Sequence, residues 1–263
     1  FAHIGLVRAL EQLQIPVDIV GGTSMGAFVS ALLACGFDSV EMAHIAHETF
    51  VARNYLNDYT LPKVSLIRGE RFHARLAAIF GSRRIEELRR SYYCISTNLT
   101  TGLPMVHDQG SLATWVGTSM SVPGVAPPIA FEGDLLCDGG VVNNLPTDVM
   151  QHLERGVIIA CNVSSNGDIR APGAGMGEPD QRALLNWKSE TRAPTLTEIL
   201  MRTATLTSDT VTQQASIERA DTYIRMPIED IGMFDWQRLD ELIERGYEHA
   251  LTLLTPLREN LLR

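Results

Sequence analysis

The stretch that decides the fold is Gly22-Thr23-Ser24-Met25-Gly26, a G-x-S-x-G pattern close to the start of the chain. The run Val17-Asp18-Ile19-Val20 before it is suited to a buried strand. The apolar run Ala27 to Cys35 after it predicts a buried helix, which Gly36 closes at the left-handed C-cap position. A serine in a strand–turn–helix junction has a strained backbone and an exposed hydroxyl, so this context predicts a nucleophile. The simpler alternative is a glycine-rich turn with a capping serine.

The rest of the chain alternates between helical and strand patterns. Helical spacing of apolar residues predicts helices over residues 3–14, 39–54, 69–80, 111–120, 146–155 and 235–254, and one long helix within 195–219. β-forming runs predict strands at 92–99, 105–107, 134–137, 157–160 and 222–225. This alternation favours an α/β fold with a mainly parallel central sheet between helices.

Domain organisation follows from what interrupts these patterns. There is neither an internal repeat nor a clean linker, so the sequence predicts a single domain over residues 1–263. Residues 164–180 hold several glycines and prolines without any period, and we expect a flexible surface loop or lid there.

Composition excludes several classes of function. The 22 Lys and Arg residues face 31 Asp and Glu residues, and a net charge of −9 does not attract nucleic acid. No run approaches about 18 uninterrupted apolar residues, so the sequence contains no membrane-spanning segment, and it has no signal peptide. The four cysteines are far apart, which favours a reducing compartment without a zinc site. We therefore expect no metal, and a location in the cytoplasm or peripheral to a membrane.

The residues next to Ser24 fit a nucleophile turn. Gly22 and Gly26 let the turn close without Cβ clashes. The backbone N–H of Met25 is the natural first donor to a developing oxyanion, and the helix N-terminus adds partial positive charge.

A serine nucleophile needs a proton acceptor, and Asp138 is the best candidate. It ends a predicted strand and precedes Gly139-Gly140, so a compact backbone can bring its carboxylate close to another loop. Carboxyl ends of neighbouring parallel strands open at one edge of a sheet, where Ser24 also emerges. The alternative is an aspartate that merely tightens a turn.

Histidine is the other possible base. Seven histidines are present, none within a motif. The order of residues in Ser-acid-His hydrolases would select His152 or His249, but that fold places several strands before its nucleophile, and here one is predicted.

Together the two motifs resemble the patatin-like phospholipase family, whose hydrolases use a Ser–Asp dyad without histidine. Three stretches carry the resemblance: Phe1-Ala2-His3-Ile4-Gly5, the serine–proline segment Thr118 to Pro128, and Asp138-Gly139-Gly140 with Asn143-Asn144-Leu145-Pro146. The middle and end of the chain are most similar to the neuropathy target esterase branch, which hydrolyses lysophospholipids.

The resemblance implies a three-layer α/β/α hydrolase with Ser24 as nucleophile and Asp138 as proton acceptor. It implies a lipid ester substrate, in particular a lysophospholipid, with possible peripheral membrane contact and no cofactor. The family's glycine-rich oxyanion loop would stand immediately before Phe1, so we expect an N-terminal truncation and reduced turnover in this chain. A Ser-His-Asp esterase and a non-catalytic lipid-binding module remain as alternatives.

Overall fold

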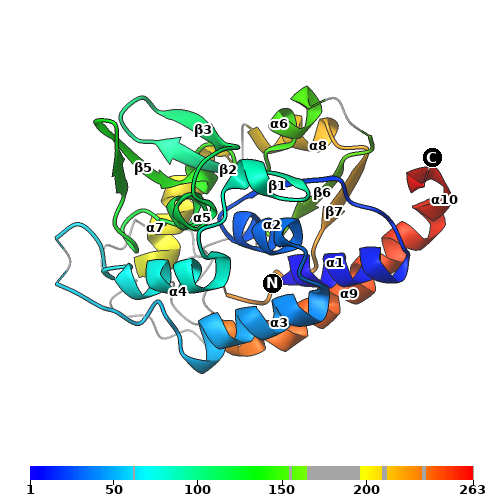
Figure 1. Ribbon diagram of the computed structural model, residues 1–263, viewed down its shortest axis with the longest axis horizontal. Helices are drawn as coiled ribbons and strands as arrows, with labels where there is room; N and C mark the ends of the chain where they lie inside the picture. Colours follow the sequence, from blue (N-terminus) through cyan, green and yellow to red (C-terminus); the bar gives the residue numbers. More distant parts are fainter. Residues whose placement is uncertain (62, 154–155, 165–195, 209–211, 233–234, 263) are drawn as a thin grey trace, which may run out of the picture.

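Strand β1 (Ile19–Thr23) and helix α2 (Met25–Cys35) form the predicted strand–turn–helix unit at the centre of the molecule (Figure 1). The computed structural model describes residues 1–263 except 62, 154–155, 165–195, 209–211, 233–234 and 263. Helix α2 is buried on almost every side, as its apolar sequence predicts, and Gly36 ends it with a φ of 93°.

Strands β1 to β5 form one mixed sheet. Parallel pairing joins β1 to β2 (Ser91–Asn98), whereas β2 pairs antiparallel with β3 (Leu103–His107) and β5 (Asp134–Asp138), and β5 with β4 (Ile129–Phe131). The expected parallel arrangement thus holds for β1–β2, but not for these three pairs. Short turns join β2 to β3 and β4 to β5, and such hairpins produce antiparallel neighbours.

Strands β1 and β5 meet end to end along β2. Residues Ser91 to Ile95 of β2 pair with β1, and Ser96 to Asn98 pair with β5. Because β3 pairs with Cys94 to Asn98, it occupies the other side of β2. The carboxyl ends of β1 and β5 therefore point toward each other on one side of β2.

A second, two-stranded sheet is parallel throughout. It consists of β6 (Ile159–Asn162) and β7 (Thr222–Arg225). Helices α6 (Thr147–His152) and α8 (Gln213–Glu218) precede these two strands. This unit confirms the second α/β segment that the sequence predicts.

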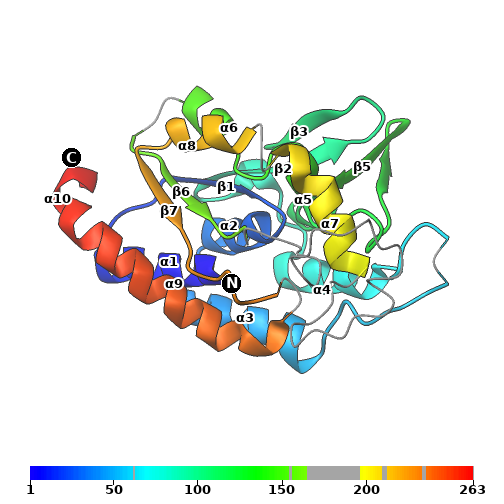
Figure 2. The same cartoon turned by 180° about the vertical axis from the view of Figure 1, so that it is seen from behind.

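Helices lie on both sides of the strands. In Figures 1 and 2, α1 (Ala2–Gln12), α3 (Ser39–Ala46) and α9 (Leu239–Leu254) lie below β1, β6 and β7, and α6 and α8 lie above them. The three-layer α/β architecture is therefore confirmed. The remaining helices are α4 (Glu70–Phe80), α5 (Leu112–Ser119), α7 (Leu196–Thr207) and α10 (Arg258–Leu261), with a π-helix at His47–Ala52. Short 3₁₀ turns lie at Ile85–Glu87, Gly139–Val141, Trp236–Arg238 and Thr255–Leu257.

Two expectations and one strand that the sequence did not predict, β4, need comment. The long helix predicted within 195–219 is two helices, α7 and α8, and the buried Ser208 between them donates a hydrogen bond to the Gly140 carbonyl. Strand β4 has three residues after two prolines, too short for a periodic signal. The loop predicted at 164–180 lies outside the described residues, apart from Ser164. No helix in the described part of the chain is long and apolar enough to cross a membrane.

Candidate active site

Ser24 occupies the turn between β1 and α2 with a strained backbone. Its φ of 55° and ψ of −120° fall in a region of backbone conformation that residues other than glycine rarely adopt, at a typical cost of about 1–3 kcal/mol. Its backbone N–H donates to Ser119 Oγ at 2.9 Å, and Ser119 Oγ in turn donates to the Ile95 carbonyl at 2.6 Å. Its own hydroxyl makes no capping hydrogen bond to α2. The turn is therefore held through the backbone, and the hydroxyl is left available for chemistry.

The two glycines beside Ser24 differ in what they permit. A Cβ on Gly22 would lie 2.5 Å from the Gly26 carbonyl carbon, so only glycine fits there. A Cβ on Gly26 would come no closer than 3.8 Å to His3 Nε2. Gly22 is thus needed to avoid a Cβ clash, as expected, whereas position 26 has room for a Cβ atom.

Asp138 is almost completely buried at the end of β5, where it pairs with Ser96 of β2. Its Oδ1 accepts a hydrogen bond from the Gly140 N–H at 2.8 Å, and Oδ2 has no partner among the described residues. Burial raises the pKa of this carboxyl to about 6, against the opposing effects of the Ser24 hydroxyl and the Gly140 N–H.

Ser24 and Asp138 come together by a different route from the one expected. The sequence predicts that the two residues lie at the carboxyl ends of neighbouring parallel strands. Instead, β5 runs antiparallel to β2, and its carboxyl end faces the carboxyl end of β1. The junction is tight, since a Cβ on Gly139 would lie 2.3 Å from the Ile95 carbonyl oxygen. A Cβ on Gly140 would lie 3.1 Å from Asp138 Oδ1, so both glycines allow the carboxylate loop to close.

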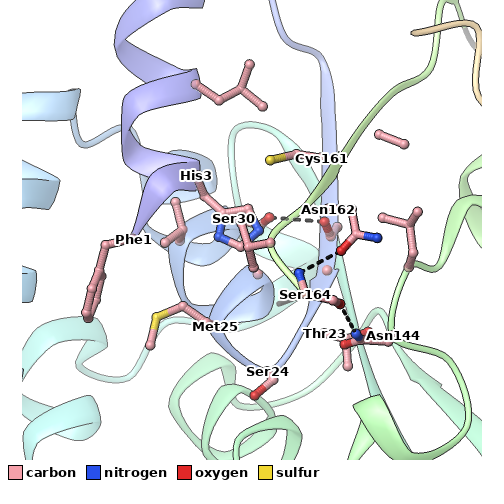
Figure 3. Close-up of a pocket in the computed structure, with 18 of the residues that line it drawn as sticks. Phe1, His3, Thr23, Ser24, Met25, Ser30, Asn144, Cys161, Asn162 and Ser164 are labelled. Atoms are coloured by element: carbon pink, nitrogen blue, oxygen red, sulfur yellow. Dashed lines mark hydrogen bonds between the residues drawn. The ribbon is translucent and has the colours of Figure 1, made fainter. Parts of the chain in front are cut away.

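Side chains that are distant in sequence anchor the turn after Asp138. Thr23 Oγ1 donates to the Asn143 carbonyl at 2.8 Å, and Ser208 Oγ donates to the Gly140 carbonyl at 2.6 Å. Asn144 Nδ2 donates to Ser164 Oγ, which follows β6 (Figure 3). Our sequence reasoning gave no role to Ser119, Thr23 or Ser208, because a single hydroxyl far from its partner leaves no local pattern.

Ser24 and Asp138 both line a cavity of about 1390 Å³. Figure 3 shows Met25 directly after Ser24, with His3 and Phe1 at the start of α1 nearby. Much of the wall is apolar, including Leu6, Val29, Phe50, Phe72, Val125 and Trp236. Because Met25 is the first residue of α2, its N–H lies at the positive end of the helix dipole.

The two predicted histidine bases do not line this cavity. His152 is exposed near the end of α6, where its Nδ1 is 2.6 Å from the Asp148 carbonyl oxygen, and His249 lies on α9. His3 does line the cavity, and burial lowers its pKa to about 3. The described residues contain no cluster of three or more His, Cys, Asp or Glu suited to a metal ion.

Comparison with known proteins finds relatives that match nearly the whole chain. Lysophospholipase NTE1 of Pyricularia oryzae is 34% identical over 98% of the chain, and lysophospholipase nte1 of Aspergillus terreus is 35% identical over 98%. The chain spans only 18% and 17% of the length of these relatives. VipD from Legionella pneumophila shares the fold with a TM-score of 0.50 at 13% identity, over 97% of this chain and 64% of that one. The model of the patatin-like phospholipases matches residues 1–150, more than half of the chain, which therefore belongs to the patatin-like phospholipase family.

Proposed function

We propose that this chain is a serine-dependent lipid acyl hydrolase in which Ser24 is the nucleophile and Asp138 accepts its proton. One observation carries the proposal. Asp138 is a buried carboxyl with a raised pKa and an Oδ2 that has no hydrogen-bond partner among the described residues. It lines the same cavity as Ser24, whose backbone is strained and whose hydroxyl makes no capping hydrogen bond. Such a carboxylate is ionised at neutral pH and more basic than an exposed aspartate.

The reaction is acyl transfer in two steps. Asp138 takes the Ser24 hydroxyl proton while Oγ attacks the ester carbonyl, and the oxyanion develops beside the Met25 N–H and the N-terminus of α2. Collapse of the tetrahedral intermediate expels the alcohol, which receives the proton from Asp138, and leaves an acyl-enzyme. Water, deprotonated by the same carboxylate, then releases the fatty acid. No step calls for a metal or an organic cofactor.

The substrate we propose is a lysophospholipid, and the chain would work at a membrane surface without spanning it. Support comes from the lysophospholipases that resemble the chain over 98% of its length. The cavity agrees in character, since its apolar wall and its volume of about 1390 Å³ suit a long acyl chain.

A fluorophosphonate probe, which reacts with activated serines, tests the proposal. We expect Ser24→Ala to abolish labelling and Asp138→Asn to slow it by about 10²–10⁴-fold, the usual contribution of a general base. His152→Ala and His249→Ala are matched controls that should label like the parent chain, and His3→Ala tests the histidine that does line the cavity.

The outcomes separate the alternatives. Labelling that survives Asp138→Asn but disappears with one histidine would replace the dyad by a Ser-His-Asp triad. If the parent chain does not label but binds a fluorescent fatty acid, the chain is a non-catalytic lipid-binding module.

A further inference from the structure

The segment between the π-helix and α4 carries exposed apolar side chains near its middle. Tyr59, Leu61 and Val64 are 73%, 82% and 67% exposed, and Lys63 between them is exposed as well. We call these four residues the interfacial tip. In Figure 1 the segment extends beyond the other elements at the left end of the molecule, and in Figure 2 at the right end.

The tip stands on a well-defined base. The Thr60 N–H donates to the Leu66 carbonyl at 3.0 Å, and the Arg68 N–H donates to the Asp58 carbonyl at 3.0 Å, as in a hairpin. The base is fixed to the body of the protein, since the N–H groups of Leu66 and Ile67 donate to the carbonyls of Gly124 and Val125. The exposed side chains of Tyr59, Leu61 and Val64 therefore lie next to a hydrogen-bonded base.

The same base forms part of the wall of the cavity that holds Ser24. Ile67 is buried and lines this cavity, together with Leu56 and with Val125, to which Ile67 is hydrogen-bonded. Exposed apolar residues and the apolar wall thus belong to one continuous segment.

The stretch of sequence that contains the tip has a net charge opposite in sign to that of the whole chain, although one of its cations, Arg53, pairs with Glu48 just outside it. Residues 51–75 carry five basic side chains, Arg53, Lys63, Arg68, Arg71 and Arg75, against two acidic ones, Asp58 and Glu70. This segment has a net charge of +3 in a chain of −9. Apolar residues beside exposed cations are the combination that anionic membrane surfaces bind.

We propose that the interfacial tip inserts into a phospholipid surface that contains anionic lipids. Lys63 and Arg68 would contact the headgroups, and Leu56 and Ile67 would lead from the surface to the cavity. This inference rests on the proposed function, because a lysophospholipid must leave a lipid surface to reach Ser24.

Binding to vesicles tests the inference separately from catalysis. Ser24→Ala protein is mixed with vesicles of phosphatidylcholine containing about 30% phosphatidylserine. We expect Leu61→Asp/Val64→Asp to weaken binding at least about tenfold, and Lys63→Glu to weaken it about fivefold. The matched control is Leu99→Asp/Leu103→Asp on the β2–β3 hairpin, where two leucines are 48% and 62% exposed. It should bind like the parent.

Insertion itself is read from Leu61→Trp, whose fluorescence should shift to the blue and be quenched by brominated lipids. In the Ser24-intact protein, Leu61→Asp/Val64→Asp should leave hydrolysis of a water-soluble short-chain ester unchanged. Equal vesicle binding by the tip variant and the parent, or equal loss in the control, would overturn the inference. So would an unquenched Trp at position 61. Absence of ester hydrolysis in every protein would refute the proposed function and leave the binding result standing.

Discussion

At the scale of single residues, Asp138 sets the expected pH dependence. It must be ionised to accept the Ser24 proton, and its pKa is raised to about 6 by burial. As pH falls through this value the carboxyl becomes protonated, so kcat/KM should fall about tenfold for each further unit. A pH profile with a short-chain ester measures this. Equal turnover at pH 5 and pH 7.5 would contradict Asp138 as the base.

The same burial predicts that Asp138 destabilises the folded chain at neutral pH. The carboxyl has a pKa of about 6 when folded and 3.8 as its ordinary value, so the native state binds the proton more tightly. Stability therefore decreases as pH rises from about 4 to about 6, and the full cost of about 3 kcal/mol persists above that.

Asp138→Asn should remove part of this cost while it removes activity. Its Oδ1 can still accept from the Gly140 N–H, but an amide group in place of Oδ2 has two hydrogens and only the Ser24 hydroxyl oxygen to accept one of them. We expect a free energy of unfolding at pH 8 that is higher than that of the parent, by less than about 3 kcal/mol. Denaturant unfolding measures the difference. A less stable variant at pH 8 would show that the charged form is favoured in the fold.

The glycines around Ser24 offer a sharper test of the turn. Gly22→Ala should prevent the native turn, because its Cβ would lie 2.5 Å from the Gly26 backbone. Gly26→Ala should fold with a Tm close to that of the parent, because this position has room for a methyl group and lies in a helix. Thermal unfolding measures the Tm of the two variants. An equal decrease in Tm in both would contradict the difference between Gly22 and Gly26.

At the scale of elements, Ser119 joins the end of α5 to the nucleophile turn. Ser119→Ala would leave the partly buried Ser24 N–H without its acceptor, so we expect a loss of about 1–3 kcal/mol in stability and slower labelling of Ser24. Ser121→Ala is the matched control. Its hydroxyl is buried as well, but it donates to the Gly117 carbonyl and not to the turn that holds Ser24. Labelling slowed equally in both variants would argue that Ser119 acts only on general stability.

The elements also show what the sequence could predict. The helical spacing of apolar residues identified α4 and α9, each of which buries one face, and continuous apolar runs bounded by Pro16 and by glycines identified β1 and α2. Strand direction was not accessible in this way. The head-to-head arrangement of β5 and β1 depends on the pairing of β5 with β2, which joins residues far apart in the sequence and leaves no local pattern. The sequence predicted that Ser24 and Asp138 lie close together at the carboxyl ends of parallel neighbours, whereas β5 runs antiparallel to β2 and its carboxyl end faces that of β1.

At the scale of the whole molecule, the separation of charge predicts how the protein approaches a membrane. A chain of net charge −9 is repelled by an anionic surface, whereas the segment 51–75, with +3, is attracted. The repulsion acts over long distances and the attraction only near contact. Ionic strength separates them, since the Debye length is about 30 Å at 0.01 M, about 10 Å at 0.1 M and about 3 Å at 1 M.

Binding to anionic vesicles should therefore pass through a maximum as salt is added. At about 0.01 M the repulsion of the whole chain reaches the surface, near 0.1 M mainly the local attraction of Lys63 and Arg68 remains, and near 1 M this is screened as well. Lys63→Glu/Arg68→Glu should abolish the maximum, whereas neutral phosphatidylcholine vesicles should show little dependence on salt. Sedimentation of the Ser24→Ala protein with vesicles measures this. A steady decrease in binding from the lowest salt concentration would mean that the negative charge of the remaining chain does not oppose docking.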